Sequence, residues 1–534
     1  MQITCLGAAR TVTGSSYLVQ MDDNACFLID CGMYQGNRQI EQRNWQSGPY
    51  RSQELQAIFI THAHIDHSGL VPRLVREGYR GPVYATKATC ELLRILWLDS
   101  AHIQEMEAEW QTRKNKRRGN KSLDPLYETA DAEAAIGLLK PVEMDCHAEI
   151  LPGVEVCFVG AGHILGAASV FLNLQGRGGP QRVGFSGDLG RPGQLIVPDP
   201  DTMPQPDTLF METTYGNRSH KSLEDSQAEL MEVIKQAYAE GGKVLIPAFA
   251  VERTQEIIYT LAEAHRQGEM PADMPVFLDS PLAIKATEIF RKHPEFFDQE
   301  TTEILNQGQT PLNLPNLEFT LSTDESRSIN EKGGPAVIIA GSGMASAGRI
   351  KHHLKHNIWR PNCHVVIVGF QAKGTTGRRL VEGAQQVKIF REDVAVRAKV
   401  HTIGGFSAHA DQGELLNWLE TLAHPGLRVY LMHGEESASL AFKAKAESRL
   451  PGLHFAVPHW KDTLKLRAPK APAKAKPRPS QEEVAARIVS LRQGLDQLAA
   501  KLEAAPEEVS GEELARLQKK LTAAERLLQA AGGA

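Results

Sequence analysis

Short apolar segments separated by turns make up the first part of the chain, to about residue 200. Strands are predicted by "NACFLID", "LQAIFITH", "PVYAT", "VEVCFVGAGH" and "QRVGFSGD", which end in or run into Asp, His or Gly. Between them, "ATCELLRILWLDSAHIQEMEAEWQ" has the spacing of one or two amphipathic helices. Polar groups are therefore expected to gather where the strands end.

From residue 217 to residue 400 the pattern changes to a regular alternation of strand and helix. Helices are predicted by "SLEDSQAELMEVIKQAYAEG" and "ERTQEIIYTLAEAHRQG", and strands by "KVLIPAF", "PVFLD", "PAVIIAGSG" and "HVVIVGFQAKG". Such alternation predicts a parallel, doubly wound sheet with its own core. After residue 400 a strand pattern returns in "RVYLMHGE", and the globular part is expected to end near residue 466.

The C-terminal segment differs in composition from the rest of the chain. Residues 467 to 480, "RAPKAPAKAKPRPS", predict an extended, basic Pro/Ala/Lys linker. Residues 481 to 534 predict two helices, because Ser480 and Ser510 each begin a Ser-x-x-Glu capping box ahead of a leucine-rich stripe. We expect a helical hairpin or coiled coil that pairs with itself, with the globular body or with another subunit as a homodimer or partner contact. A basic arm that holds RNA is the alternative.

The composition narrows the class of protein. A chain of 534 residues is too long for one core and favours two or three domains. No apolar run approaches the ~20 residues that a membrane-spanning helix needs, so no membrane partner is expected. Seven cysteines without a CxxC pair fit a reducing compartment, and we expect a cytoplasmic protein. The net charge of −5 means that any nucleic-acid function must use a local site.

The segment "THAHIDHSG" contains three histidines and an aspartate within six consecutive positions. It follows an apolar strand, and this density of metal-binding side chains is a strong motif. His62 and His64, two positions apart, can face the same side of an extended backbone and share one cation. Asp66 and His67 can face a second cation. Two ions about 4 Å apart would turn a bridging water into hydroxide and stabilise a displacement reaction.

One loop cannot complete two metal sites, so other segments must supply ligands. His163 in "GAGHILG", Asp188 in "FSGDLG" and His433 in "YLMHGE" each follow a predicted strand. Taken alone, each residue type is common in turns, but together with the histidine loop they form a candidate ligand set. Asp188 is a natural bridge between two ions, because a carboxylate has two oxygens.

These motifs together resemble the metallo-β-lactamase fold, and more narrowly its β-CASP nucleases. The resemblance rests on HxHxDH, the Gly-flanked histidine, "SGD", "FMETTYG", "GGFSAHAD" and "YLMHGE", and it covers roughly residues 1 to 466. It implies an α/β protein: an αββα sandwich into which a parallel-sheet α/β (β-CASP) domain is inserted. The implied boundaries are residues 1–216 and 401–466 for the sandwich and 217–400 for the insertion. The family includes the endonuclease subunit of the mRNA 3′-end cleavage complex and bacterial ribonuclease J.

The resemblance also implies a role for each residue of the motifs. One Zn²⁺ would be held by His62, His64, His163 and Asp188. The second would be held by Asp66, His67, His433 and the shared Asp188. His409 would protonate the leaving oxygen as the general acid and Glu212 would orient it, with Asp66 at the same catalytic site. Asp30 would support the metal-binding loop.

The long insertion between Asp188 and His433 is used to predict the class of substrate. Asp188 and His433 are 245 positions apart, which leaves room for a domain that covers the site. Two of its strands run through small-residue turns into basic helices, so anions could bind there. The candidate phosphate contacts are Ser342, Arg349, Lys373, Arg378 and Arg379.

By resemblance, a histidine at position 433 favours RNA over DNA. We therefore expect a zinc-dependent ribonuclease, endo- or exonucleolytic, that hydrolyses single-stranded RNA through a metal-bridging hydroxide and leaves 5′-phosphate and 3′-hydroxyl ends. Three alternatives stay open: a DNA nuclease of the same family, a small-molecule thioester or lactam hydrolase, and an inactive RNA-binding scaffold.

Overall fold

The computed structural model describes residues 1–117, 121–369, 371 and 374–466 of the chain. In this part, one mixed sheet of seven strands contains both ends of the described chain. Its strand order is β22 (Thr463–Lys465), β1 (Gln2–Cys5), β2 (Tyr17–Gln20), β3 (Cys26–Ile29), β4 (Leu55–Phe59), β5 (Val83–Thr86) and β6 (Leu139–Val142).

A second sheet of seven described strands packs against the first. Its strand order is β21 (His454–Ala456), β20 (Arg428–Met432), β11 (Thr208–Glu212), β10 (Gln181–Phe185), β9 (Ala168–Leu174), β8 (Val154–Gly160) and β7 (Ala148–Leu151). Strands β10, β11 and β20 run parallel, so their carboxyl ends meet at one edge of the sheet. Glu212, the last residue of β11, pairs with Met432, the last residue of β20.

Aromatic side chains fill the space between the two sheets. Phe27 and Phe59 come from the first sheet and Phe185 and Phe210 from the second, and all four are buried. The rings of Phe185 and Phe210 stack with centroids 5.0 Å apart. Replacing one such ring by alanine would cost about 3–5 kcal/mol. This core holds the two sheets at a fixed separation and so fixes the edge where their strands end.

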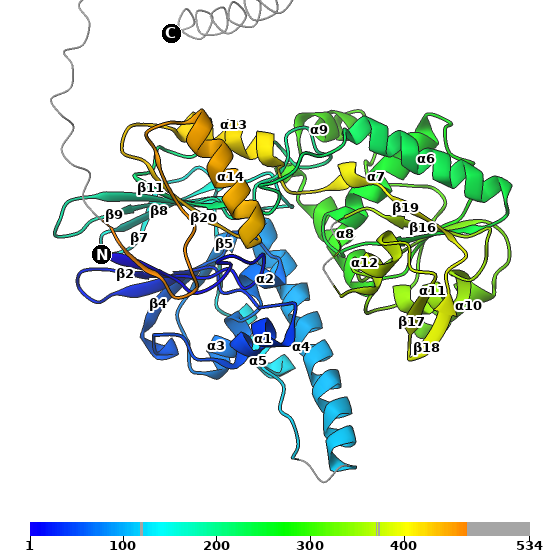
Figure 1. Cartoon of the computed structure of the whole chain (residues 1–534), viewed down its shortest axis with the longest axis horizontal. Coiled ribbons are helices and arrows are strands. Elements are labelled where there is room, and N and C mark those ends of the chain that lie inside the picture. Colours follow the sequence, from blue (N-terminus) through cyan, green and yellow to red (C-terminus); the bar gives the residue numbers. More distant parts are fainter. Residues whose placement is uncertain (118–120, 370, 372–373, 467–534) are drawn as a thin grey trace, which may run out of the picture. The chain divides into compact units, whose positions relative to one another are not determined.

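Helices cover the outer faces of both sheets, as Figure 1 shows. The first sheet carries α2 (Ile65–Ser68), α3 (Val71–Arg76), α4 (Lys87–Lys116) and α5 (Thr129–Ile136). The second carries α13 (Gln412–Leu422) and α14 (Glu436–Arg449). The segment predicted as one or two helices is a single helix of 30 residues, α4. The shorter α1 (Arg38–Glu41), η1 (Gln42–Trp45) and η2 (Ser52–Glu54) complete this part. The αββα sandwich is confirmed.

A six-stranded sheet of the described residues forms the inserted domain. Its order is β14 (Leu317–Phe319), β13 (Val276–Leu278), β15 (Ala336–Ala340), β12 (Lys243–Pro247), β16 (His364–Ile367) and β19 (Lys399–Thr402). All five pairings are parallel. The predicted parallel sheet is therefore confirmed.

Side chains of the central strand β12 alternate between the two faces of this sheet. Val244 and Ile246 pack with α6 (Leu223–Ala239), α7 (Arg253–Arg266) and α8 (Pro281–Lys292). Leu245 packs on the other face, in the cluster that contains α10 (Thr323–Glu331), α11 (Ile350–Asn357) and α12 (Thr376–Val381). Burial on both faces explains why the strands are continuously apolar. The remaining elements are η3 (Pro294–Phe296), α9 (Gln299–Asn306), the hairpin β17 (Gln386–Ile389) and β18 (Glu392–Ala395), and η4 (Gly404–Phe406).

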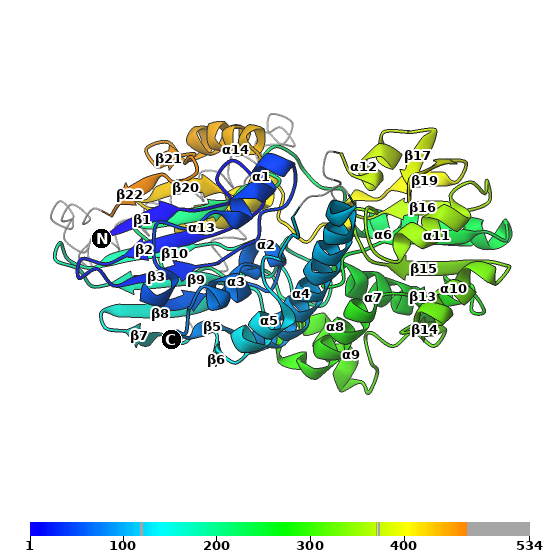
Figure 2. The same ribbon diagram turned by 90° about the horizontal axis from the view of Figure 1, so that it is seen from below.

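The long helix α4 of the sandwich packs against α8 of the inserted domain, and Figure 2 shows α4 beside the insert. Strand β19 belongs to the inserted sheet and ends at Thr402, slightly beyond the boundary expected at residue 400. The predicted linker, residues 467 to 480, and the helical tail, 481 to 534, lie outside the described residues. Within the described residues, no helix combines the length and apolar character needed to cross a membrane.

Candidate metal centre

The predicted ligands come from four places in the chain and meet at one edge of the sandwich. His62, His64, Asp66 and His67 lie in the loop and short helix after β4. His163 lies in the turn between β8 and β9, Asp188 follows β10 and His433 follows β20. A backbone hydrogen bond from Ala168 N–H to the carbonyl of Thr61 joins the two sheets at this edge. The fold thus brings all seven predicted ligands together.

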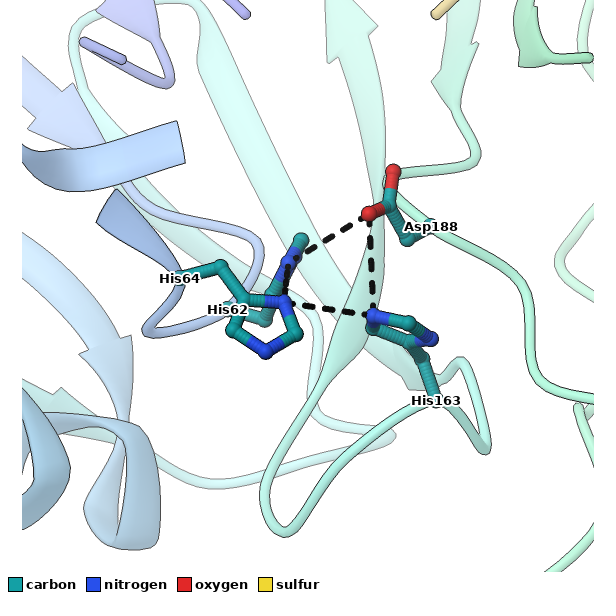
Figure 3. Close-up of side chains that lie close together, drawn as sticks. All are labelled: His62, His64, His163 and Asp188. Atoms are coloured by element: carbon teal, nitrogen blue, oxygen red, sulfur yellow. Dashed lines mark hydrogen bonds and ion pairs between the residues drawn. The ribbon is translucent and has the colours of Figure 1, made fainter. Parts of the chain in front are cut away.

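The first group consists of His62, His64, His163 and Asp188, drawn in Figure 3. His64 Nδ1 lies 3.0 Å from His62 Nε2 and 3.3 Å from His163 Nε2. Asp188 Oδ2 lies 3.5 Å from His62 Nε2 and 3.6 Å from His163 Nε2. Ligands at bond lengths of about 2.0–2.2 Å on a tetrahedral ion are separated by roughly 3.3–3.6 Å. The four atoms therefore have the spacing of a tetrahedral zinc site.

The second group consists of Asp66, His67 and His433. The Nε2 atoms of His67 and His433 are 3.1 Å apart, and His433 Nε2 lies 3.5 Å from Asp66 Oδ2. The other oxygen of Asp188, Oδ1, lies 3.3 Å from His67 Nε2. Asp188 thus directs one carboxylate oxygen at each group.

The chemistry of these donors fits cations. Within the described part of the chain, the buried Oδ1 atom of Asp188 accepts no hydrogen bond. An unmatched buried carboxylate oxygen is costly unless a positive charge compensates it. Burial lowers the pKa of His64 to about 4, and burial likewise lowers the pKa values of His62 and His163. These three imidazoles are neutral near pH 7, which is the state that binds metal ions.

Hydrogen bonds behind the ligands fix the imidazole orientations. His67 Nδ1 donates to Asp30 Oδ2 at 2.7 Å, so His67 Nε2 faces the second group. Asp30 Oδ1 accepts the backbone N–H of Thr61 at 2.9 Å, and Asp30 Oδ2 also accepts the hydroxyl of Ser15 at 3.2 Å. His163 Nδ1 donates to the carbonyl of Ala408 at 3.2 Å. Such partners set which nitrogen is free to bind a metal.

His67 differs electrostatically from the other ligands. Burial alone would lower the pKa of His67, but the carboxylates of Asp188 and Asp30 outweigh this effect and raise it well above the usual value. A cation binding here must therefore displace a proton from His67, which makes its affinity depend on pH.

The backbone around Asp66 is closely packed. Ser15 N–H donates to the carbonyl oxygen of Asp66 at 2.7 Å. A Cβ atom at Gly32 would lie only 1.6 Å from the same carbonyl oxygen. Only glycine at position 32 lets the loop that carries Asp66 and His67 approach this closely.

His409 and Glu212 form a pair beside the first ligand group. His409 Nδ1 lies 3.2 Å from Glu212 Oε1, and its ring centroid is 4.5 Å from that of His163. Burial alone would lower the pKa of His409, but the carboxylate of Glu212 outweighs it, followed by Asp188 and Asp66, so the pKa is raised. The side chain of His409 is 22% exposed whereas that of Glu212 is fully buried. His409 can therefore reach a substrate and carry a proton to it.

Glu212 also lies near Asp188 and His433, in a third cluster with metal-ligand spacing. Its Oε1 accepts the backbone N–H of Leu189 at 2.6 Å, and its Oε2 accepts that of Thr214 at 3.1 Å. Because both oxygens are engaged by the backbone, the geometry favours Glu212 as the support of His409 over Glu212 as a metal ligand.

The predicted phosphate contacts have different surroundings. Arg349 Nη1 donates to the buried carboxylate of Asp279 at 2.6 Å, and its Nη2 donates to the carbonyl of Leu321 at 2.7 Å. Arg349 thus pairs with Asp279 inside the inserted domain, and its role as a phosphate contact stays a prediction. Arg378 Nε donates to Glu382 at 2.7 Å.

The surroundings of two further candidates, Arg379 and Ser342, also differ. Arg379 Nη2 donates to the carbonyl of Gln386 at 3.0 Å. Ser342 lies in the exposed turn after β15, where its hydroxyl accepts the N–H of Ala347 at 3.3 Å. Ser342 and Arg378 stay predictions, and Lys373 lies outside the described residues.

Sequence reasoning missed several supporting residues. Thr61 donates both its hydroxyl and its N–H to Asp30. Because Thr61 is the first residue of the histidine motif, its position in the sequence could have identified it as a supporting residue. Glu252 gave no such signal. Its Oε2 accepts the N–H of Leu165 at 3.0 Å, a contact that joins the inserted domain to the loop carrying His163.

Comparison with known families and proteins agrees with this architecture. Residues 9–232 match the metallo-beta-lactamase superfamily, 254–380 the Beta-Casp domain, and 393–458 the Zn-dependent metallo-hydrolase RNA specificity domain. Ribonuclease TTHA0252 of Thermus thermophilus is 39% identical over 441 residues, which cover 83% of this chain and 95% of that protein. Transcription termination factor FttA of Methanocaldococcus jannaschii is 31% identical over 451 residues, covering 83% and 68%. FttA of Thermococcus kodakarensis is 32% identical over 484 residues, covering 88% and 72%.

The fold and the site define a metal-dependent hydrolase with the metallo-β-lactamase architecture. The chain belongs to the β-CASP family of that superfamily. The predicted family and fold class are confirmed.

Removal of the shared carboxylate tests the two-group arrangement. We expect Asp188→Ala to lower the zinc content from two ions per chain to below one, because both groups lose a ligand and the imidazoles lose their counter-charge. Elemental analysis of protein purified with excess zinc measures this content. Asp324→Ala, at a side chain that is 93% exposed, is the matched control and should keep the wild-type content. Two ions per chain in Asp188→Ala would contradict a shared site.

Proposed function

We propose that this protein is a zinc-dependent ribonuclease that hydrolyses phosphodiester bonds of single-stranded RNA and leaves 5′-phosphate and 3′-hydroxyl ends. The observation that carries the proposal is the position of Asp188, whose two oxygens face two separate ligand groups beside His409. The match to an RNA specificity domain and the relatives named as a ribonuclease and transcription termination factors support RNA as the substrate.

The proposal assigns each ligand group one Zn²⁺. His62, His64 and His163 would hold the first ion, Asp66, His67 and His433 would hold the second, and Asp188 would contribute to both sites. Bound divalent ions would lower the pKa of water and stabilise negative charge on the phosphate. Asp30 keeps His67 in the tautomer whose Nε2 faces the site. The same proposal places the protein in the cytoplasm, which its seven free cysteines support.

His409 is proposed to donate the proton that the leaving oxygen needs. Its Nδ1 faces Glu212, so the ring can present Nε2–H to a bound substrate. Loss of the 3′-oxygen of the upstream nucleotide, with protonation by His409, yields a 3′-hydroxyl and leaves the phosphate on the 5′ end of the downstream product. Glu212 keeps this imidazole charged and oriented, because the buried carboxylate raises its pKa.

A panel of substrates tests the reaction class. We expect the zinc-loaded protein to cleave labelled single-stranded RNA, with product ends that a 5′-monophosphate-dependent exonuclease accepts. DNA of the same sequence, thioesters and lactams form the comparison. A circular RNA distinguishes internal cleavage from cleavage at an end. Turnover of the esters without phosphodiester cleavage would refute the proposal, and fewer than one zinc per chain after purification with excess zinc would favour an inactive RNA-binding scaffold.

Replacement of the proposed acid separates chemistry from metal binding. We expect His409→Ala to retain two zinc ions per chain but to cleave RNA about 10²–10⁴ times more slowly, because a general acid usually contributes that factor. Single-turnover rates with saturating enzyme measure the chemical step. His459→Ala, at an exposed histidine outside the site, should be indistinguishable from wild type. Loss of zinc from His409→Ala would show that His409 is a ligand instead.

The pH dependence of the rate tests the Glu212–His409 pair. A general acid must be protonated, so a raised pKa of His409 keeps the rate high until the pH passes that pKa. Glu212→Gln removes the nearest negative charge and lowers the pKa of His409. The fall in rate on the alkaline side should therefore begin at lower pH than in wild type. A rate–pH profile measured on protein with unchanged zinc content and melting temperature checks this, and an alkaline limb that stays in place would contradict the pairing.

A further inference from the structure

The hairpin of the inserted domain has an unusual turn. Ile389 of β17 pairs with Glu392 of β18, so Phe390 and Arg391 alone form the loop. Both have a positive φ, 49° at Phe390 and 70° at Arg391. Two-residue turns of this kind strongly favour Asn and Gly, and a bulky aromatic residue at positive φ is an outlier. The side chain of Phe390 is 42% exposed, so core packing does not explain its presence.

A lysine and an imidazole lie beside the exposed ring of Phe390. Lys351 Nζ lies 4.6 Å from the ring centroid, and the imidazole centroid of His352 lies 4.5 Å from it. Both come from α11, which packs against β17. Strained backbone that persists at exposed residues points to a function other than stability.

A second exposed aromatic residue meets the same hairpin from the sandwich. Trp110, near the end of α4, is 53% exposed. Lys114 Nζ lies 5.1 Å from the Trp110 ring centroid, and Arg391 Cζ lies 5.9 Å from it. The tip of the hairpin therefore connects the two rings. We name the residues Trp110, Lys114, Lys351, His352, Phe390 and Arg391 the basic aromatic surface.

Two of the acidic side chains next to this surface are paired. Arg113 Nη2 lies 2.6 Å from Glu109, and Lys355 Nζ lies 2.7 Å from Glu392. Because Glu109 and Glu392 are paired, Lys114, Lys351 and Arg391 contribute positive charge near the rings of Trp110 and Phe390. A polyanion can bind here although the chain as a whole has a net charge of −5.

We propose that the basic aromatic surface binds single-stranded RNA, with bases stacked on Trp110 and Phe390 and phosphates beside the cations. The inference rests on the proposed ribonuclease function and adds a second contact region, since none of the six residues belongs to the metal centre. An exposed ring with a neighbouring cation suits both parts of an unpaired nucleotide: the base face and the phosphate. Duplex RNA cannot offer its base faces, so the surface selects unpaired strands.

Replacement of the turn separates RNA binding from stability. The double variant Phe390→Asn with Arg391→Gly installs residues that the turn prefers, so its melting temperature should equal or exceed that of wild type. Its affinity for RNA should fall about 10-fold, the usual order for losing one stacked base with its cation. Trp110→Ala should weaken binding to a similar degree. Trp45→Ala, with the same 53% exposure, is the matched control and should bind as wild type does.

The assay uses the full-length, zinc-loaded chain with His409→Ala as the common background, so that RNA stays intact during measurement. Fluorescence anisotropy of a labelled single-stranded 20-mer gives the affinity, and the salt dependence should become shallower by about 0.7 per lost phosphate contact. Duplex RNA should compete poorly. Unchanged affinity in both the turn variant and Trp110→Ala would overturn the inference, as would polyglutamate competing as well as RNA, which would identify an acidic protein partner.

A small substrate distinguishes failure of this inference from failure of the proposed function. Hydrolysis of a p-nitrophenyl phosphodiester reports on the metal centre alone, and the surface variants without His409→Ala should match wild type with this substrate. With long RNA they should show a raised KM and an unchanged kcat. An enzyme that cleaves RNA with the same KM in all variants would retain the proposed function and refute the surface. A chain that binds RNA through the surface but cleaves no phosphodiester would refute the proposed function alone.

Discussion

The buried carboxylate of Asp188 is the interaction on which the rest of the site depends. Burial alone would raise its pKa, but the imidazoles of His433, His67 and His62 outweigh that effect and lower it well below the usual value. The carboxylate therefore stays charged in a place where an isolated charge would be very unfavourable. Its geometry requires that β10 and β20 end at the same edge of the sheet, and the parallel order β10, β11, β20 provides this. The order of the strands thus places the carboxylate of Asp188 close to the imidazole of His433, which lowers its pKa.

Residues of the inserted domain support the loops that form the metal centre, as the contact between Glu252 and Leu165 shows. Within the sandwich, Arg191 Nη1 donates to the carbonyl of Gly405 at 2.6 Å, which ties the segment after Asp188 to the segment before His409. The N–H of Asp298 donates to the carbonyl of Ile196 at 2.8 Å. Buried hydrogen bonds of this kind hold side chains in one geometry, and a site for hydrolysis needs its acid and its ligands within a few tenths of an ångström. The inserted domain therefore contributes to the rigid support of the site.

The sequence was informative where chemistry forces a local pattern. The histidine density between residues 62 and 67, and the strands ending at Asp188 and His433, predicted which side chains meet, and the alternation after residue 217 predicted the parallel sheet. Contacts between distant segments could not be predicted in this way. The ion pair between Arg349 and Asp279, for example, joins residues 70 positions apart, and no local pattern indicates it. The turn at Phe390 was missed because it lacks the Asn and Gly that mark such turns.

Residues with a positive φ occur both at the metal centre and in the basic aromatic surface. Asp30 and His433 both have positive φ, 57° and 46°. Each is held by hydrogen bonds that oppose relaxation: Thr61 N–H donates to Asp30, and the N–H of His433 donates to the carbonyl of Ala8 at 2.7 Å. In the hairpin, the ladder of β17 and β18 fixes Phe390 in the same way. The strained backbone at Asp30 and His433 directs a carboxylate and an imidazole toward the metal centre. The interactions of these side chains at the site compensate for the strain. Phe390 is 42% exposed and lies beside Lys351 and His352, and the proposed RNA contact would account for an aromatic residue at this turn.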